Sequence, residues 1–105
     1  MKLQELLQCV KECLQTLYGD RFKGLILYGS EAIDKAQPDS DIDLLCLLEG
    51  PISIYKEIRA TTDATYPLQL EHLDRMLHIM PVDAAKFNSG AIGFYRIVQR
   101  EGKPI

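Results

Sequence analysis

Two aspartates at the start of an apolar run are the residues best suited to chemistry. Asp41 and Asp43 stand in the stretch Ser40-Asp41-Ile42-Asp43, and apolar residues follow them to Leu48. In an extended strand, residues two apart point to the same side, with α-carbons about 6 to 7 Å apart. Two carboxylates so placed repel each other and are costly to desolvate unless a positive charge joins them.

A divalent cation would supply that charge. No lysine or arginine stands within three residues of either aspartate. Carboxylate oxygens suit Mg²⁺ or Mn²⁺. The competing interpretation is a hydrated strand end, where aspartate is common, and the pair alone does not separate the two.

A Gly-Ser pair adds a second feature. Gly29 and Ser30 follow the apolar run Lys23–Tyr28, and ten residues separate Ser30 from Asp41. A glycine after a strand and a serine at a helix start expose backbone N–H groups to which a phosphate can come close. Most such pairs are simple turns. Together with the two aspartates, however, the pattern arises by chance in roughly one chain of this length per thousand.

The elements that must position these residues follow from hydrophobic spacing and from glycine and proline signals. We expect strands with a buried central member, separated by helices, which predicts an α/β (α+β) protein with a small mixed β-sheet and flanking helices. At this length we expect one domain, residues 1–105. The expected helices are Lys2–Tyr18, Glu31–Ala36 capped by Ser30 and closed by Pro38, Ile52 to about Pro67, Asp83–Phe87 and Ala91–Arg100; the expected strands are Lys23–Tyr28, Asp41–Leu48 and Leu73–Val82.

Composition excludes several classes of function. Twelve basic and fifteen acidic residues, with no basic cluster, argue against direct nucleic-acid binding. No apolar run reaches the ~18 residues that a membrane span needs. The three cysteines, Cys9, Cys13 and Cys46, have no metal-ligand spacing, which is typical of reduced thiols in a cytoplasmic protein.

Two motifs carry a resemblance to a known family. The stretches LYGS at Leu27–Ser30 and DSDIDLL at Asp39–Leu45 resemble those of the minimal nucleotidyltransferases in the DNA polymerase beta-like superfamily. A weaker resemblance extends over nearly the whole chain. It implies the polymerase beta-like nucleotidyltransferase fold, with ATP as the expected substrate.

The resemblance also implies roles for single residues. Gly29 and Ser30 would hold the β- and γ-phosphates of a nucleoside triphosphate. Asp41 and Asp43 would bind two Mg²⁺ ions, with Mn²⁺ as an alternative, and two metals suit an in-line displacement at phosphorus. A third carboxylate on the next strand would complete the catalytic and metal site.

The third carboxylate has two candidates. Asp74 stands at the entry of the expected strand and is our first choice. Glu71, three residues earlier, is the second choice, and its alternative assignment is to the preceding helix. The structural alternative for Asp74 is a surface residue paired with Arg75 or with water. We expect His78 to be a satisfied core histidine and give it no role.

The chain departs from the family pattern after the Gly-Ser pair. Where the family usually has GSxARG, this chain has Glu31 and Asp34, and negative charge is unfavourable beside a triphosphate. Lys35 is a partial substitute that the sequence does not place. The departure keeps a second hypothesis open, in which a catalytically degenerate protein of this fold acts as a binding module or antitoxin scaffold.

The first hypothesis is an enzyme that moves AMP from ATP to a hydroxyl group. The chain is too short for an acceptor-binding domain of its own, so the acceptor would belong to a partner protein. Through the resemblance we expect a small helical partner of the HEPN class and a role as the antitoxin of a toxin–antitoxin pair. The oligomeric state stays open.

Overall fold

The structure is a computed structural model that describes residues 2–105. Short 3-10 turns at Gly19–Arg21 (η1) and Gly29–Glu31 (η2) flank the first strand. The other elements are α1 (Leu3–Tyr18), β1 (Phe22–Tyr28), β2 (Ile42–Leu48), α2 (Ile54–Glu71), β3 (Leu77–Asp83), α3 (Ala84–Asn88), α4 (Gly93–Glu101) and β4 (Lys103–Pro104).

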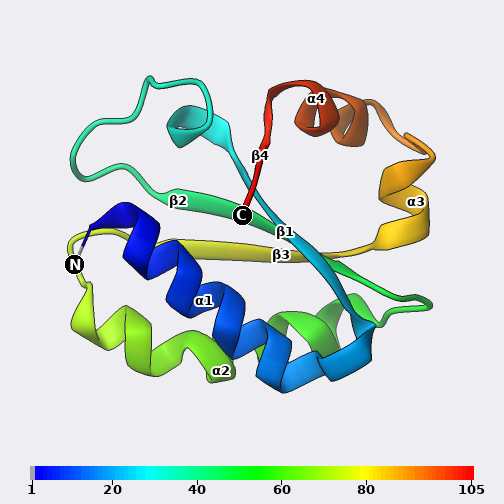
Figure 1. Cartoon of the computed structure of the whole chain (residues 1–105), viewed down its shortest axis with the longest axis horizontal. Helices are drawn as coiled ribbons and strands as arrows, with labels where there is room; N and C mark the ends of the chain where they lie inside the picture. The colour runs from blue at the N-terminus through cyan, green and yellow to red at the C-terminus, as the bar shows by residue number, and fades with distance from the viewer. Residues whose placement is uncertain (1) are drawn as a thin grey trace.

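The four strands form one mixed sheet in the order β3-β2-β1-β4. β1 pairs antiparallel with β2 and with β4, whereas β2 and β3 run parallel. Helices α1 and α2 lie on one side of this sheet, and α3 and α4 lie on the other (Figure 1). The predicted fold class is confirmed: a small mixed sheet with helices on its flanks.

The core has two layers because the side chains of each strand alternate between the faces of the sheet. Every residue of the central strand β2 is buried except Asp43, as its apolar sequence predicts. Leu44 and Cys46 face α1 and α2, whereas Leu45 and Leu47 face α3 and α4. Asp43 therefore belongs to the face of α3 and α4, at the end of the strand that those two helices leave least covered.

Two predicted helices differ from the observed structure. The short helix over Glu31–Ala36 is absent, and the 3-10 turn η2 is followed by irregular chain up to β2. The helix expected to end near Pro67 instead continues to Glu71. Pro67 is exposed. Proline has no N–H to donate within the helix, and this missing hydrogen bond lies on the solvated side of α2, opposite the buried Thr61 and Thr65. The helix can therefore continue past Pro67.

Two predictions about strands were also wrong in part. β3 begins at Leu77 rather than at Leu73, because the residues after α2 form a turn. The chain after α4, expected only to end a helix, adds the edge strand β4, whose Lys103 pairs with Leu27. Within residues 2–105, none of the helices is long and apolar enough to cross a membrane.

Candidate functional site

The two sequence motifs meet at one end of the sheet. β1 ends at Tyr28, beside the start of β2 and β3, so that Tyr28, Asp43 and His78 form one row in register across the three strands. Direct cross-strand neighbours project to the same face. The Gly-Ser pair follows Tyr28 at once, and Asp41 precedes β2. The sheet register thus brings the predicted phosphate turn and the predicted metal ligands to one place.

Gly29 lies directly against the carboxylate of Asp43. A β-carbon built on Gly29 would lie 2.5 Å from Oδ2 of Asp43, and the φ angle of Gly29 is +75°. Any side chain here would collide with the carboxylate and would also strain the backbone. Glycine is therefore required at this position for two physical reasons, and the turn keeps a carboxylate oxygen close to its backbone.

Ser30 occupies the middle of the η2 turn. The expected side-chain cap of a helix is absent, since no such helix forms. Its carbonyl oxygen accepts a hydrogen bond from the backbone N–H of Lys35 at 2.9 Å, which closes the turn. The part of Ser30 in phosphate binding stays a prediction, and its partly buried position beside Gly29 is compatible with it.

The charge on Asp43 is poorly accommodated by the protein alone. Burial raises the pKa of the Asp43 carboxyl above its ordinary value, the negative charge of Asp41 raises it further, and His78 opposes the shift. Burial, with the charge of Asp43 added, also raises the pKa of Tyr28. Within residues 2–105, no lysine or arginine forms an ion pair with Asp41 or Asp43. The site therefore holds uncompensated negative charge.

His78 is a site residue that sequence reasoning missed. It was expected in the core, but it is exposed, and its Nε2 lies 3.5 Å from Oδ2 of Asp41. The alternation of side chains along β3 could have predicted this position. Leu77 and Ile79 pack on the α1 and α2 side, so His78 and Met80 lie on the same face as Asp43.

Neither candidate for the third carboxylate lies on β3. Asp74 is in the turn before the strand, and Glu71 is the last residue of α2. Gln69 holds that turn: its side-chain amide donates to the carbonyls of His72 and Arg75, both at 2.9 Å, and accepts from the N–H of Leu77 at 2.7 Å. The expectation that Asp74 stands at the strand entry was wrong, and its catalytic and metal roles stay predictions.

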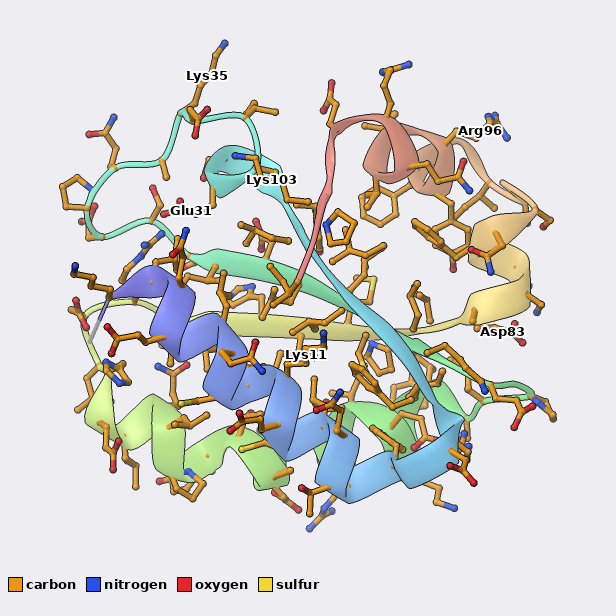
Figure 2. The ribbon with its side chains drawn as sticks, viewed as in Figure 1. Lys11, Glu31, Lys35, Asp83, Arg96 and Lys103 are labelled. Carbon is orange, nitrogen blue, oxygen red and sulfur yellow. The ribbon has the colours of Figure 1, made fainter. Side chains whose placement is uncertain are left out.

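The two acidic residues after the Gly-Ser pair are both neutralised by distant cations. Glu31 forms an ion pair with Arg75 at 2.5 Å, and these side chains are only 18% and 15% exposed. Nε of Arg75 also donates to the carbonyl of Ser40 at 2.8 Å. Asp34 pairs with Lys103 at 3.5 Å. Figure 2 shows Lys103 reaching from β4 toward the η2 turn, whereas Lys35 points outward and does not replace the missing arginine.

A hollow of about 360 Å³ opens beside Asp43 at the edge of the sheet, and Ile58 and Thr62 of α2 line its opposite side. Tyr28, Asp43, His78 and Met80 line it on the site face. Within residues 2–105, no three histidine, cysteine, aspartate or glutamate side chains group closely enough to hold a metal ion by themselves. Two carboxylates nevertheless fit Mg²⁺, because that ion is usually bound by one or two carboxylates together with substrate phosphates and water.

Comparison with known protein families identifies the family of the chain. A family model described as the nucleotidyltransferase domain matches residues 7–97. The matched residues include the Gly-Ser turn, both aspartates and His78. No curated protein matches the chain.

Proposed function

Because the chain belongs to the nucleotidyltransferase domain family, we propose that it moves a nucleoside monophosphate, AMP from ATP, to a hydroxyl group on a partner protein. The observation that carries this proposal is the contact between the two motifs. Gly29 lies against Asp43, although Gly29 belongs to the η2 turn after β1 and Asp43 belongs to β2. A turn that exposes backbone N–H groups beside two carboxylates that no lysine or arginine neutralises suits a triphosphate bound together with a cation.

In this proposal the turn residues and the aspartates have separate roles. The backbone at Gly29 and Ser30 receives the β- and γ-phosphates, and the side chains of Asp41 and Asp43 hold Mg²⁺. The cation, when bound, supplies positive charge to the phosphate oxygens and lowers the pKa of the acceptor hydroxyl. The acceptor oxygen forms a bond to the α-phosphorus, the bond to pyrophosphate breaks in line, and the hydroxyl proton passes to solvent water.

The identity of the partner rests on the resemblance to minimal nucleotidyltransferases. We propose a small helical protein of the HEPN class as the acceptor, with this chain as its antitoxin. Intact mass measurement of such a protein after incubation with this chain, ATP and Mg²⁺ tests the idea. A mass increase equal to one or more AMP units is expected, and an unchanged mass in the presence of bound ATP would exclude that acceptor.

Calorimetric titration with ATP tests the metal and phosphate site itself. We expect saturable binding in the presence of Mg²⁺, and its loss in the Asp41→Asn/Asp43→Asn double variant. Asp39→Asn is the matched control, because it removes an exposed carboxylate just before the pair and should leave binding unchanged. Equal binding with and without Mg²⁺, or full binding by the folded double variant, would contradict the proposal.

One observation favours the second candidate function, a binding module without catalysis. The position on β3 in register with Asp43 is His78, and the only carboxylate of that strand is Asp83 at its far end. Release of pyrophosphate separates the two functions. Mg²⁺-dependent ATP binding without pyrophosphate release in the presence of the acceptor would favour the binding module, and turnover would favour the enzyme.

A further inference from the structure

Helix α2 carries a row of exposed side chains along its outer surface. The row consists of every fourth residue of the helix: Ile54, Ile58, Thr62, Tyr66 and Leu70. Side chains at this spacing form one continuous ridge on a helix. All five are exposed, and the four apolar members are between 42% and 55% exposed. A continuous apolar surface of this kind is typical of a protein interface.

The rest of the described chain packs on the other side of α2. Glu57, Thr61 and Thr65 of α2 are buried. Ala64 shares a hollow with Cys13 of α1 and, at 100° of helical turn per residue, lies on the side of α2 away from the ridge. Figure 1 shows α2 at the lower margin of the molecule, beside α1. The ridge is therefore free to contact another molecule.

The ridge is symmetric about Thr62. Ile58 and Tyr66 stand one helical step before and after it, and Ile54 and Leu70 stand two steps away. The smallest side chain of the ridge is thus at its centre, where two crossing helices come closest. Two ridges of this spacing interlock at an angle of about −50°, which is the commonest class of helix packing. In a two-fold pair each surface meets an identical one, and a ridge symmetric about its centre suits that arrangement.

The exposed charges of α2 are separated to either side of Thr62. The basic residues, Lys56 and Arg59, precede it, and the acidic residues, Asp63 and Glu71, follow it. Within residues 2–105, none of these four forms an ion pair. In an antiparallel pair of α2 helices, the basic half of each helix lies against the acidic half of the other. A parallel pair would bring like charges together, so the charges favour the antiparallel orientation.

We propose that two copies of this chain form a two-fold symmetric dimer in which their α2 ridges cross, antiparallel, at Thr62. Arg59 of each copy then lies near Asp63 of the other copy. Together with Tyr55, which is 85% exposed beside the ridge, the apolar side chains expose on the order of 500 Å² per copy. A pair would bury on the order of 1,000 Å², which reaches the size that a specific interface needs.

The dimer contact borders the candidate functional site. Ile58 and Thr62 also line the hollow beside Asp43, on the side that α2 contributes. The contact itself involves no nucleotide and no metal ion. The inference therefore does not depend on the proposed function, and it can be tested on the protein alone.

Size-exclusion chromatography with light scattering of the whole chain measures the dimer. We expect a mass near twice the 11.9 kDa of one chain, decreasing toward that of one chain on dilution. Arg59→Glu and Asp63→Arg, each alone, place like charges against each other and should each weaken the dimer roughly tenfold or more. An equimolar mixture of the two variants restores opposite charges. Heterodimers should then form, and native mass spectrometry detects them.

The apolar part of the contact is tested by Ile58→Ala/Tyr66→Ala, which should also weaken the dimer roughly tenfold or more. Ile92→Ala/Ile97→Ala is the matched control, because these side chains are 50% and 47% exposed at α4, on the other side of the sheet. The control should leave the dimer unchanged. Circular dichroism checks the folding of each variant, and the two charge variants alter only exposed side chains, so they keep the test available if Ile58→Ala/Tyr66→Ala does not fold.

Three outcomes would overturn the proposal. The first is a wild-type protein that is monomeric at every concentration. The second is a dimer that all the α2 variants retain, because the contact would then involve another surface. The third is a pair of charge variants that are monomeric alone and stay monomeric when mixed, because the helices would then not pair antiparallel. None of these outcomes bears on the proposed function, which the ATP titration tests separately.

Discussion

Two pairs of acidic residues near the same turn have opposite surroundings. Glu31 and Asp34 follow the Gly-Ser pair, and each has a basic partner, Arg75 or Lys103. Asp41 and Asp43 begin the central strand, and within residues 2–105 their only ion-pair partner is His78, which contacts Asp41. Both pairs look alike in the sequence as closely spaced carboxylates.

The difference shows which carboxylates are structural. The protein neutralises Glu31 with a largely buried arginine that also binds the carbonyl of Ser40, so this ion pair connects the η2 turn, the chain before β2 and the turn before β3. It leaves Asp43 partly buried without a full positive charge. Burying charge without compensation is costly, and such a cost is more common at functional sites than elsewhere.

The largest effect is expected from breaking the Glu31–Arg75 pair. Arg75→Ala leaves the Glu31 carboxylate mostly buried without its partner, and we expect a loss of about 3 kcal/mol in the free energy of unfolding. Urea denaturation measures it. The Arg75→Ala/Glu31→Gln double variant removes the unpaired charge as well and should recover a large part of the loss. A loss below about 0.5 kcal/mol for Arg75→Ala would place this pair with ordinary surface ion pairs.

A smaller effect on stability is expected from Asp43→Asn, and this substitution should stabilise the metal-free protein, whereas Arg75→Ala should destabilise it. Burial raises the pKa of this carboxyl above its ordinary value of 3.8, so the folded protein keeps the proton to a higher pH than the unfolded chain does. Its contribution to stability is therefore greatest below pH 3.8 and is lost as the pH rises through the raised pKa. Asp43→Asn should become more stable than the metal-free wild type as the pH rises through this window.

Urea midpoints at a series of pH values, with and without Mg²⁺, check the prediction for Asp43. Mg²⁺ should raise the midpoint of the wild type and leave that of Asp43→Asn nearly unchanged, because a ligand stabilises only the state that binds it. The Asp39→Asn variant, measured in parallel, controls for a general loss of negative charge. A wild type that gains stability relative to Asp43→Asn as the pH rises would show that Asp43 is already compensated by the protein.

The smallest effect on stability is expected from breaking the ion pair between Asp34 and Lys103. Lys103 and Asp34 are both exposed, and exposed ion pairs contribute little. Lys103→Ala should change the free energy of unfolding by about 0.5 kcal/mol or less, measured by the same urea denaturation. A loss comparable to that of Arg75→Ala would mean that β4 and the η2 turn depend on each other far more than one exposed contact suggests.

Local patterns predicted the parts of the fold that short segments encode. The helical spacing of leucines gave α1, and the unbroken apolar run gave β2 with its buried interior. The motif spacing singled out Gly29, Asp41 and Asp43, and Gly29 and Asp43 indeed touch. Pro67 led to a wrong prediction of where this helix ends. Proline disfavours a helix in isolation, whereas the packing of α2 on the protein maintains the helix beyond it.

The sequence was sufficient to indicate a phosphate turn, a pair of carboxylates and the family to which they belong, because each depends on residue type and short spacing. It was not sufficient to show that Arg75 neutralises Glu31, that Lys103 reaches Asp34, or that His78 stands beside Asp41. Those contacts join segments far apart in the chain, and they exist because parallel pairing of β3 and antiparallel pairing of β4 bring these segments to the turn after β1. A one-residue shift in either register would turn these side chains to the opposite face.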